Sequence, residues 1–374
     1  MARTRLGFGL LGPLQVSVAG APVAVGTPKQ RAVLAMLLIN RNRTVSTEAL
    51  IDAAWDGTPV PAARASIHSY VSNLRRLLSA GHDETQTVLA NSPPGYRLGV
   101  ADGDCDLDRF VAGKTAGLHA AAAGRFEEAG SHLSAALAEW RGPVLDDLAD
   151  FGFVDAFAAA LVEDKVLVHT ARAEAEIACG RGYSVISELE ALAGEHPYRE
   201  PLWAQLITAY YAVERQSDAL AAYRRLKAVL AEGLGIDPGP TVSALHHRIL
   251  RQERLDTRQA ARETAVHTLA RTRTGACGPP VAALRDAAGR AYPLLAGATR
   301  IGRLPDNDIV LNDADVSRHH AVIIDTGSSF VITDMRSANG VRVQGRRLQP
   351  SATLAHGDRI GICGHEFTVE IQPQ

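Results

Sequence analysis

Three short polar blocks between residues 301 and 340 strongly constrain what this chain can fold into. The first is Ile301-Gly302-Arg303, the second covers residues 317–320, and the third covers residues 337–340. Apolar runs of the kind that forms strands adjoin them, at residues 309–311, 321–324 and 330–332. Polar loops backed by short apolar strands predict an all-β domain whose loops carry a binding site.

The side chains in these blocks suit a phosphorylated peptide. Arginine and serine side chains hold a doubly charged phosphate, and an asparagine amide can hold the backbone of the peptide that carries it. The blocks contain no nucleophile paired with a base. The alternative is that the serines and the asparagine cap turns while the arginines are solvated. The candidate phosphopeptide-binding residues are Arg303, Ser317, Arg318, His320, Ser337 and Asn339.

The order and spacing of the blocks resemble the forkhead-associated (FHA) domain, a β-sandwich that binds phosphothreonine peptides. The resemblance extends over about 85 residues, from 290 to 374. It implies that Arg303 and Ser317 bind the phosphate and that Arg318 and Asn339 fix the peptide. It also implies that His320 supports the site from inside.

Residues 1–100 are basic, although the formal net charge of the whole chain is only −2. This segment holds 10 Lys or Arg against 5 Asp or Glu, a formal excess of +5, which favours an anionic partner such as DNA. Apolar runs within residues 6–25 predict a small antiparallel sheet. Thr27-Pro28 predicts a helix to about Asn40, and Ser46 with Glu48 predicts another that ends near Trp55.

A third predicted helix, over residues 62–78, is amphipathic. Its apolar face would comprise Ile67, Tyr70, Val71, Leu74, Leu77 and Leu78. A hairpin around residues 91–95 would follow and complete a winged helix-turn-helix. The opposite face offers donors for phosphates and base edges, although a polar face can also be merely solvated. The candidate DNA-binding residues are Arg64, Ser66, His68, Ser69, Ser72, Asn73, Arg75, Arg76 and Arg97.

Residues 65–78 with the segment 94–98 resemble the recognition helix and wing of OmpR-type DNA-binding domains. A domain of this type at the N-terminal end resembles the SARP/AfsR group of bacterial activators. Residues 104–250 resemble the bacterial transcriptional activator domain of that group. Their partial tetratricopeptide (TPR) spacing around Trp203, Tyr210 and Tyr223 predicts stacked helix pairs.

Several classes of protein and site are disfavoured. No apolar run approaches the roughly 18 residues of a membrane span, and no signal-peptide core is present, so we expect a cytoplasmic protein. The cysteines, His246-His247 and the acidic turns near residues 306–315 lack metal-site spacing, so no metal or cofactor is predicted. The four cysteines are Cys105, Cys179, Cys277 and Cys363. The sequence contains no Gly-rich phosphate-binding loop with a lysine and no catalytic triad. An enzyme is therefore not predicted.

The predicted architecture is multidomain α+β, with a winged helix at 1–103, an all-α TPR-like domain at 104–250 and an all-β FHA sandwich at 281–374. Residues 251–280 are predicted to be a helix tail and a flexible linker. This order resembles the EmbR-type regulators. The resemblance implies a transcriptional regulator whose partners are double-stranded promoter DNA, a phosphorylated Ser/Thr protein kinase and RNA polymerase. The alternative is a phospho-dependent adaptor or kinase inhibitor with weak or no DNA binding.

Overall fold

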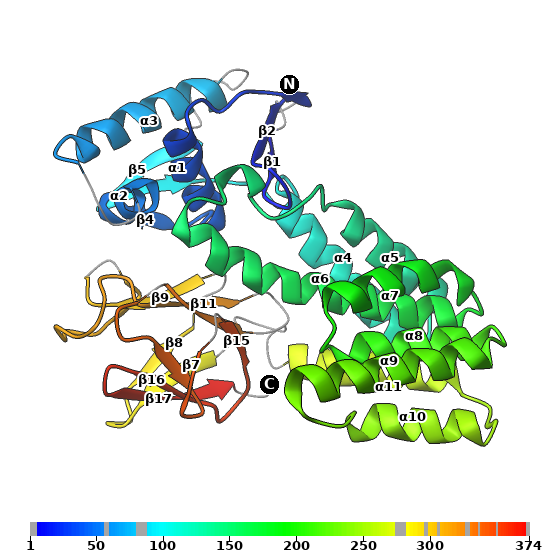
Figure 1. Cartoon of the computed structure of the whole chain (residues 1–374). Coiled ribbons are helices and arrows are strands. Elements are labelled where there is room, and N and C mark those ends of the chain that lie inside the picture. Colours follow the sequence, from blue (N-terminus) through cyan, green and yellow to red (C-terminus); the bar gives the residue numbers. More distant parts are fainter. Residues whose placement is uncertain are drawn as a thin grey trace. The chain divides into compact units, whose positions relative to one another are not determined.

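The computed structural model describes residues 6–55, 60–79, 88–273, 282–294, 298–304, 307–325, 330–335, 337–348 and 351–371. The chain divides into two compact units. Unit 1 comprises Met1–Val111, Ala138–Asp164 and Arg271–Gln374, and unit 2 comprises Ala112–Leu137 and Lys165–Ala270. Figure 1 shows the chain with many of its helices and strands labelled.

The N-terminal domain of unit 1 contains the three predicted helices. They are α1 (Pro28–Ile39), α2 (Thr47–Trp55) and α3 (Ala63–Leu78). Thr27 caps α1 by accepting a hydrogen bond from the backbone N–H of Gln30 at 3.3 Å, with proline in the first turn as predicted. Ser46 does the same for α2, since its Oγ accepts from the N–H of Ala49 at 3.0 Å. Both helix starts that the sequence predicted are therefore confirmed.

Two small sheets complete this domain. β1 (Leu6–Gly9), β2 (Gln15–Val18) and β3 (Ala21–Pro22) form the first sheet. Its third strand ends just before residues 23–25, which are the last of the apolar runs in this part of the sequence. The second sheet has the order β4-β6-β5. It consists of β4 (Thr44–Ser46), β5 (Leu89–Ser92) and β6 (Gly95–Leu98). The predicted hairpin is β5–β6, and β4 is a strand that sequence patterning did not reveal.

The segment around the start of α6 (Gly152–Ala178) is tied to the N-terminal domain by acidic side chains. Asp147 accepts a hydrogen bond from the backbone N–H of Leu14 at 2.7 Å and forms an ion pair with Arg31 at 3.1 Å. These contacts of Asp147 hold the segment before α6 against the N-terminal domain. At the start of α4 (Asp106–Ala122), the buried carboxylate of Asp106 accepts from the backbone N–H groups of Leu10 and Leu11 at 2.8 to 2.9 Å.

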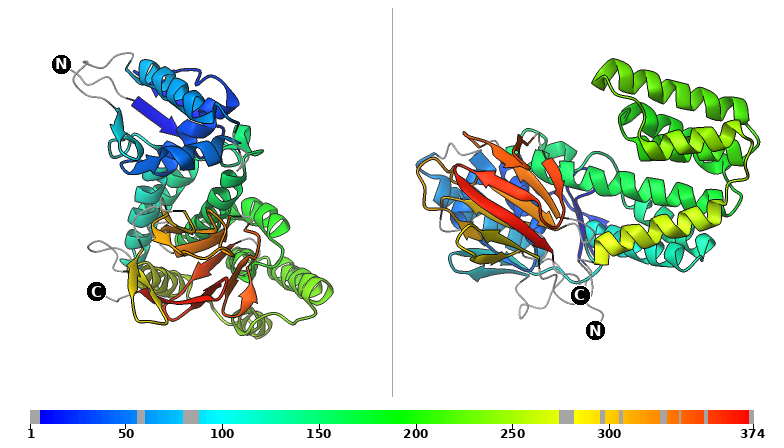
Figure 2. Two further views of the ribbon diagram at one scale, coloured as in Figure 1. Left: turned by 90° about the vertical axis from the view of Figure 1, so that its left-hand side faces the viewer. Right: turned by 90° about the horizontal axis from the view of Figure 1, so that it is seen from below.

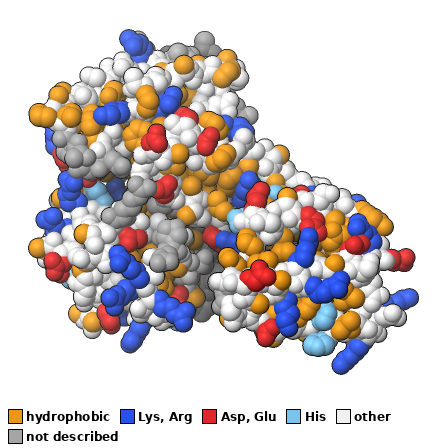
Figure 3. Space-filling model, in the orientation of Figure 1, with side chains coloured by type: hydrophobic (Ala, Val, Ile, Leu, Met, Phe, Trp, Pro, Cys, Tyr) orange, Lys and Arg blue, Asp and Glu red, His pale blue; other side chains and the backbone are white. Residues whose placement is uncertain are grey.

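Unit 2 consists of paired helices, as the TPR-like spacing predicted (Figure 1). The helices besides α6 are α4 (Asp106–Ala122), α5 (Phe126–Ala138), α7 (Tyr183–Glu195), α8 (Glu200–Ala212), α9 (Gln216–Leu234), α10 (Pro240–Leu250) and α11 (Thr257–Arg273). Trp203 and Tyr210 lie in a core shared by α7, α8 and α9. Acidic and basic side chains are interspersed over the face of this unit seen in Figure 3.

Within the segment 251–280, predicted as a helix tail and a flexible linker, the helical part is longer than a tail. Residues 257–273 form α11, and Ala261 and Ala265 pack with Phe126 and Ala129 of α5 in a small core. The sequence did not indicate the extent of this helix, because small alanines rather than large apolar residues make its packing contacts. Residues 274–280, which include Cys277, lie outside the described part of the chain.

The C-terminal domain is a β-sandwich, as predicted. One sheet has the order β10-β9-β11-β12-β15, the other β14-β13-β16-β17-β7-β8, and apolar side chains from both form one core (Figure 2). Its strands are β7 (Ala282–Asp286), β8 (Ala291–Pro293), β9 (Ala298–Gly302), β10 (Ile309–Val310), β11 (Ala321–Asp325), β12 (Phe330–Asp334), β13 (Val341–Val343), β14 (Arg346–Arg347), β15 (Ser351–Leu354), β16 (Arg359–Ile362) and β17 (His365–Ile371).

None of the described helices is long and apolar enough to cross a membrane. Within the same residues, no cluster of three or more His, Cys, Asp or Glu side chains could hold a metal ion. His246 instead stacks on Tyr223, with ring centroids 3.8 Å apart.

Candidate phosphopeptide and DNA-binding sites

The loop after β9 lies directly against the loop before β11. The N–H of Arg303 donates to the carbonyl of Ser317 at 3.1 Å, and Nε of Arg303 donates to the carbonyl of Val316 at 3.2 Å. Gly302 permits this approach, because a Cβ at this position would lie 2.3 Å from the carbonyl oxygen of Arg318. The first two sequence blocks therefore form one surface.

His320 contacts the second block from inside the sandwich. Its side chain is fully buried. Nδ1 accepts a hydrogen bond from the backbone N–H of Ser317 at 3.1 Å, and Nε2 lies 3.1 Å from the carbonyl of Gly340. The imidazole therefore carries its proton on Nε2 and links the second block to the third.

The third block closes over the second. The backbone N–H of Ala338 donates to Oγ of Ser317 at 3.1 Å, and Nδ2 of Asn339 donates to the carbonyl of Asp315 at 2.8 Å. Oγ of Ser337 accepts from the N–H of Gly340 at 3.0 Å, so Ser337 shapes the turn. The Arg303, Arg318 and Asn339 side chains remain exposed around these contacts.

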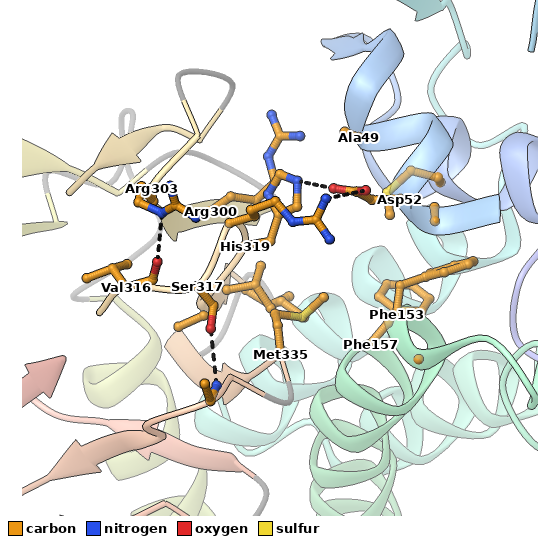
Figure 4. Close-up of a pocket in the computed structure, with 18 of the residues that line it drawn as sticks. Ala49, Asp52, Phe153, Phe157, Arg300, Arg303, Val316, Ser317, His319 and Met335 are labelled. Carbon is orange, nitrogen blue, oxygen red and sulfur yellow. Dashed lines mark hydrogen bonds and ion pairs between the residues drawn. The ribbon is translucent and has the colours of Figure 1, made fainter. Parts of the chain in front are cut away.

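A cavity of about 720 Å³ opens beside these loops, and all of the residues that line it belong to unit 1. Arg303, Ser317 and Asn339 line it from the C-terminal domain. Its other wall is made by residues of α1, α2 and the first turns of α6. Figure 4 shows Arg303 and Ser317 on one side and Phe153 and Phe157 across from them, with Met335 between.

One acidic residue of the N-terminal domain reaches the second block. Oδ2 of Asp52 lies 3.0 Å from Nε2 of His319, and Oδ1 of Asp52 lies 4.0 Å from Nη1 of Arg318 (Figure 4). A second ion pair of opposite sense joins Arg43 to Asp308 at 3.4 Å. Neither pair was predicted from the sequence, because the partners lie more than 260 positions apart and carry no local signal.

The α3 helix shows the predicted two faces. Ile67, Val71, Leu74 and Leu78 are buried, whereas Tyr70 and Leu77 are only half-buried. On the polar side the exposed residues are Arg64, His68, Ser69, Ser72, Asn73 and Arg76, and Ser66 is half-buried. Arg97 is exposed on β6, in the wing.

Not all of the candidate DNA-binding side chains are equally available. Nε of Arg75 donates to the carbonyl of Leu89 at 2.8 Å, and its Nη2 donates to Oδ1 of Asn91 at 2.7 Å, so Arg75 ties α3 to the wing. His68 hydrogen-bonds the Tyr96 hydroxyl at 2.7 Å. Arg76, by contrast, is exposed and contacts Asn73 of its own helix at 3.2 Å.

Three family models match this chain in the predicted order. "Transcriptional regulatory protein, C terminal" matches residues 21–98, "Bacterial transcriptional activator domain" matches residues 105–250, and "FHA domain" matches residues 299–363. The helical and β-rich parts therefore coincide with recognised domains.

The chain is also similar to known proteins over almost its whole length. It is 66% identical over 371 residues to the transcriptional regulatory protein EmbR of Mycobacterium tuberculosis, covering 98% of this chain and 96% of that protein. It is 54% identical over 250 residues to MoaR1 of the same organism, covering 67% of this chain and 80% of MoaR1. A solved structure of M. tuberculosis EmbR in complex with a low-affinity phosphopeptide matches with a TM-score of 0.90 and 65% identity, covering 99% of each chain.

Identity of this extent, together with the three domain matches and the matching fold, establishes the family. The chain belongs to the EmbR-type transcriptional regulators of the SARP group, with a DNA-binding regulator domain, a bacterial transcriptional activator domain and an FHA domain in that order.

Proposed function

We propose that this protein binds promoter DNA through α3 and its wing, binds phosphothreonine on a Ser/Thr protein kinase through its FHA domain, and couples the kinase signal to transcription. The observation that carries the proposal is the convergence of Arg303, Ser317 and Asn339 on one cavity. These side chains supply charge and donors for a phosphate and a peptide backbone. The phosphopeptide complex of the related EmbR supports the same use of the domain.

The DNA-binding part of the proposal is supported by the α3 helix. The Arg76 side chain and the neighbouring Ser72 and Asn73 are exposed on a helix whose opposite face is buried, which is the arrangement that a recognition helix in a major groove requires. The regulator-domain match covers this helix and the wing. RNA polymerase is the partner we propose for the DNA-bound regulator, and we propose no catalytic activity.

A paired titration on one sample of the full-length chain tests the function. A phosphothreonine peptide should bind, and its unphosphorylated form should bind at least tenfold more weakly, because charge-assisted hydrogen bonds contribute roughly 1.5 to 3 kcal/mol each. Arg303→Ala, Ser317→Ala and Asn339→Ala should each lower the affinity about tenfold. Equal affinity for the two peptides would rule out phosphothreonine recognition.

The same sample distinguishes a regulator from the alternative kinase adaptor or inhibitor. A regulator should retard a promoter fragment with an affinity that falls steeply as salt rises, since bound DNA must release counterions. Phosphopeptide binding combined with no retardation of any duplex at low salt would favour the adaptor. The two activities are read separately, so the loss of one does not conceal the other.

A further inference from the structure

The cavity beside the phosphate-binding loops is lined by three parts of unit 1. The FHA domain supplies the polar side chains Arg303, Ser317 and Asn339, together with apolar side chains such as Val316 and Met335. The opposite side is largely apolar and comes from outside the FHA domain. We call it the apolar wall, and it consists of Met36 and Ile39 of α1, Ala49 and Ala53 of α2, and Phe153 and Phe157 of α6.

We propose that a phosphothreonine peptide lies in this cavity and packs an apolar side chain, carried next to the phosphothreonine, against the apolar wall. The proposal rests on the proposed function, since it assigns that site a preferred class of peptide. It makes the DNA-binding domain a direct participant in the choice of the peptide. An isolated FHA domain would lack this contact.

The chemistry of the two sides, taken together, indicates what kind of ligand occupies the cavity. Arg303 and Arg318 give the cavity an anion-binding side, which a purely apolar ligand would leave without a partner. Phe153 and Phe157 lie across the cavity from the phosphate-binding Ser317 (Figure 4). A volume of about 720 Å³ lies within the range of roughly 300 to 1,000 Å³ typical of ligand pockets. A short peptide with one phosphate and one apolar side chain satisfies both sides at once.

Three pairs of oppositely charged or polar side chains hold the apolar wall in place. Asp147 ties the segment before α6 to Arg31 of α1 at 3.1 Å, and Arg43 pairs with Asp308 of the FHA domain at 3.4 Å. Asp52 pairs with His319 at 3.0 Å. A prepositioned wall can favour one side chain over another, because less ordering is needed when the peptide binds.

The test uses the full-length protein and synthetic peptides. The reference peptide has phosphothreonine flanked only by alanine, and in each further peptide one alanine is replaced by leucine. Binding is followed by fluorescence anisotropy. Leucine at one flanking position should raise the affinity about tenfold, as expected when a leucine side chain is removed from water, whereas leucine at the other positions should have little effect.

Ile39→Gln then locates the contact. Ile39 is half-buried at the end of α1, outside the FHA domain. The variant should lose most of the leucine preference, measured as the ratio of its affinities for the leucine-containing and the all-alanine phosphopeptides. Val60→Gln is the matched control, because Val60 is an exposed apolar residue of the same domain that does not line the cavity, and it should retain the preference. If Ile39→Gln does not fold, Met36→Gln replaces it.

The outcomes separate the two proposals. The proposal that the apolar wall binds a peptide side chain is overturned if leucine has no effect at any position. It is also overturned if the preference for leucine survives Ile39→Gln unchanged. A preference lost equally in Val60→Gln overturns it as well. An all-alanine peptide that binds equally with and without its phosphate instead overturns phosphothreonine recognition itself.

Discussion

The carboxylate of Asp52, on α2 of the DNA-binding domain, lies 3.0 Å from Nε2 of His319, close to Ser317 of the FHA domain. Nδ2 of Asn307 donates to two carbonyls, so its Oδ1 is oriented as an acceptor toward Nδ1 of His319, 3.1 Å away. Nδ1 therefore carries a proton. The contact between Asp52 and Nε2 is an ion pair when the imidazole is protonated on both nitrogens.

Asp52 should also compete with a bound peptide for Arg318, whose Nη1 lies 4.0 Å from Oδ1 of Asp52. We expect Asp52→Asn to raise the affinity for the all-alanine phosphopeptide about three- to tenfold, because a partly buried charge pair of this kind contributes on the order of 1 kcal/mol. The leucine preference should fall, since the variant no longer anchors the apolar wall. Glu48→Gln on the same helix, whose partner is the exposed Arg64, should change neither quantity. Unchanged binding by Asp52→Asn would show that Asp52 does not influence the site.

Peptide and DNA should affect each other's binding. The peptide site is bounded by α1 and α2, which pack against α3, so a peptide that alters these contacts alters the DNA-reading helix. We expect a coupling of about 1 to 3 kcal/mol, equal in both directions because linkage is reciprocal. The measurement is the peptide affinity with and without saturating promoter DNA. Identical affinities would mean that the FHA domain only recruits the kinase.

Gly302 should be required for phosphopeptide binding. A Cβ at this position would lie 2.3 Å from the backbone carbonyl of Arg318, and a backbone atom cannot swing aside as a flexible side chain can. We expect Gly302→Ala to push the loops that carry Arg303 and Ser317 apart and to lower phosphopeptide affinity at least tenfold. Gly361→Ala is the control in the same domain, because its Cβ would make only an ordinary 3.7 Å contact with Arg342. Equal affinities of the two variants would contradict the expectation.

Arg75 and Arg76 should have different effects on DNA binding. Arg76→Ala should lower the affinity for all sequences and reduce the slope of log affinity against log salt by about one, as the loss of one phosphate contact does. Arg75→Ala should in addition lower the melting temperature, because Arg75 holds the wing through Leu89 and Asn91. Arg224→Ala, an exposed arginine of α9, controls for the change in net charge. If Arg75→Ala and Arg76→Ala both bind DNA as Arg224→Ala does, the expectation that α3 contacts DNA is contradicted.

Glu174 should make the stability of the helical unit depend on pH. Burial raises the pKa of its carboxyl from 4.5 to about 8, and Nε2 of Gln205 donates to it at 2.9 Å. The folded state retains a proton that the unfolded chain releases. The stability that this group contributes is therefore fully present below about pH 4.5 and is lost progressively as the pH rises to about 8.

We expect Glu174→Gln, which needs no proton, to be more stable than the parent at pH 8 by as much as about 4 kcal/mol. The difference should shrink toward pH 5. Thermal unfolding across this range provides the measurement, and Glu195→Gln on the exposed side of α7 should show no such trend. A difference between Glu174→Gln and the parent that does not vary with pH would contradict the expectation.

The sequence by itself predicted the elements whose signals are local. Thr27 with Pro28 and Ser46 indicated two helix starts, because capping depends on neighbouring residues. The alternation around Ile323 and Ile332 indicated the strands of the sandwich, because successive side chains of a strand point to opposite faces. The order of the polar blocks likewise indicated which side chains would meet at the FHA loops.

Only the tertiary structure revealed what depends on contacts between distant segments. Helix α11 was hidden because it packs through alanines, whose small apolar surface gives little periodic signal. Arg75 reads as one more polar residue of α3, yet its hydrogen bonds to the wing distinguish it from Arg76. The pairing of Asp52 with His319 and the apolar wall beside Ser317 arise from packing between domains. Local sequence patterns cannot predict such contacts, because the residues that surround one partner in the sequence carry no information about the other partner.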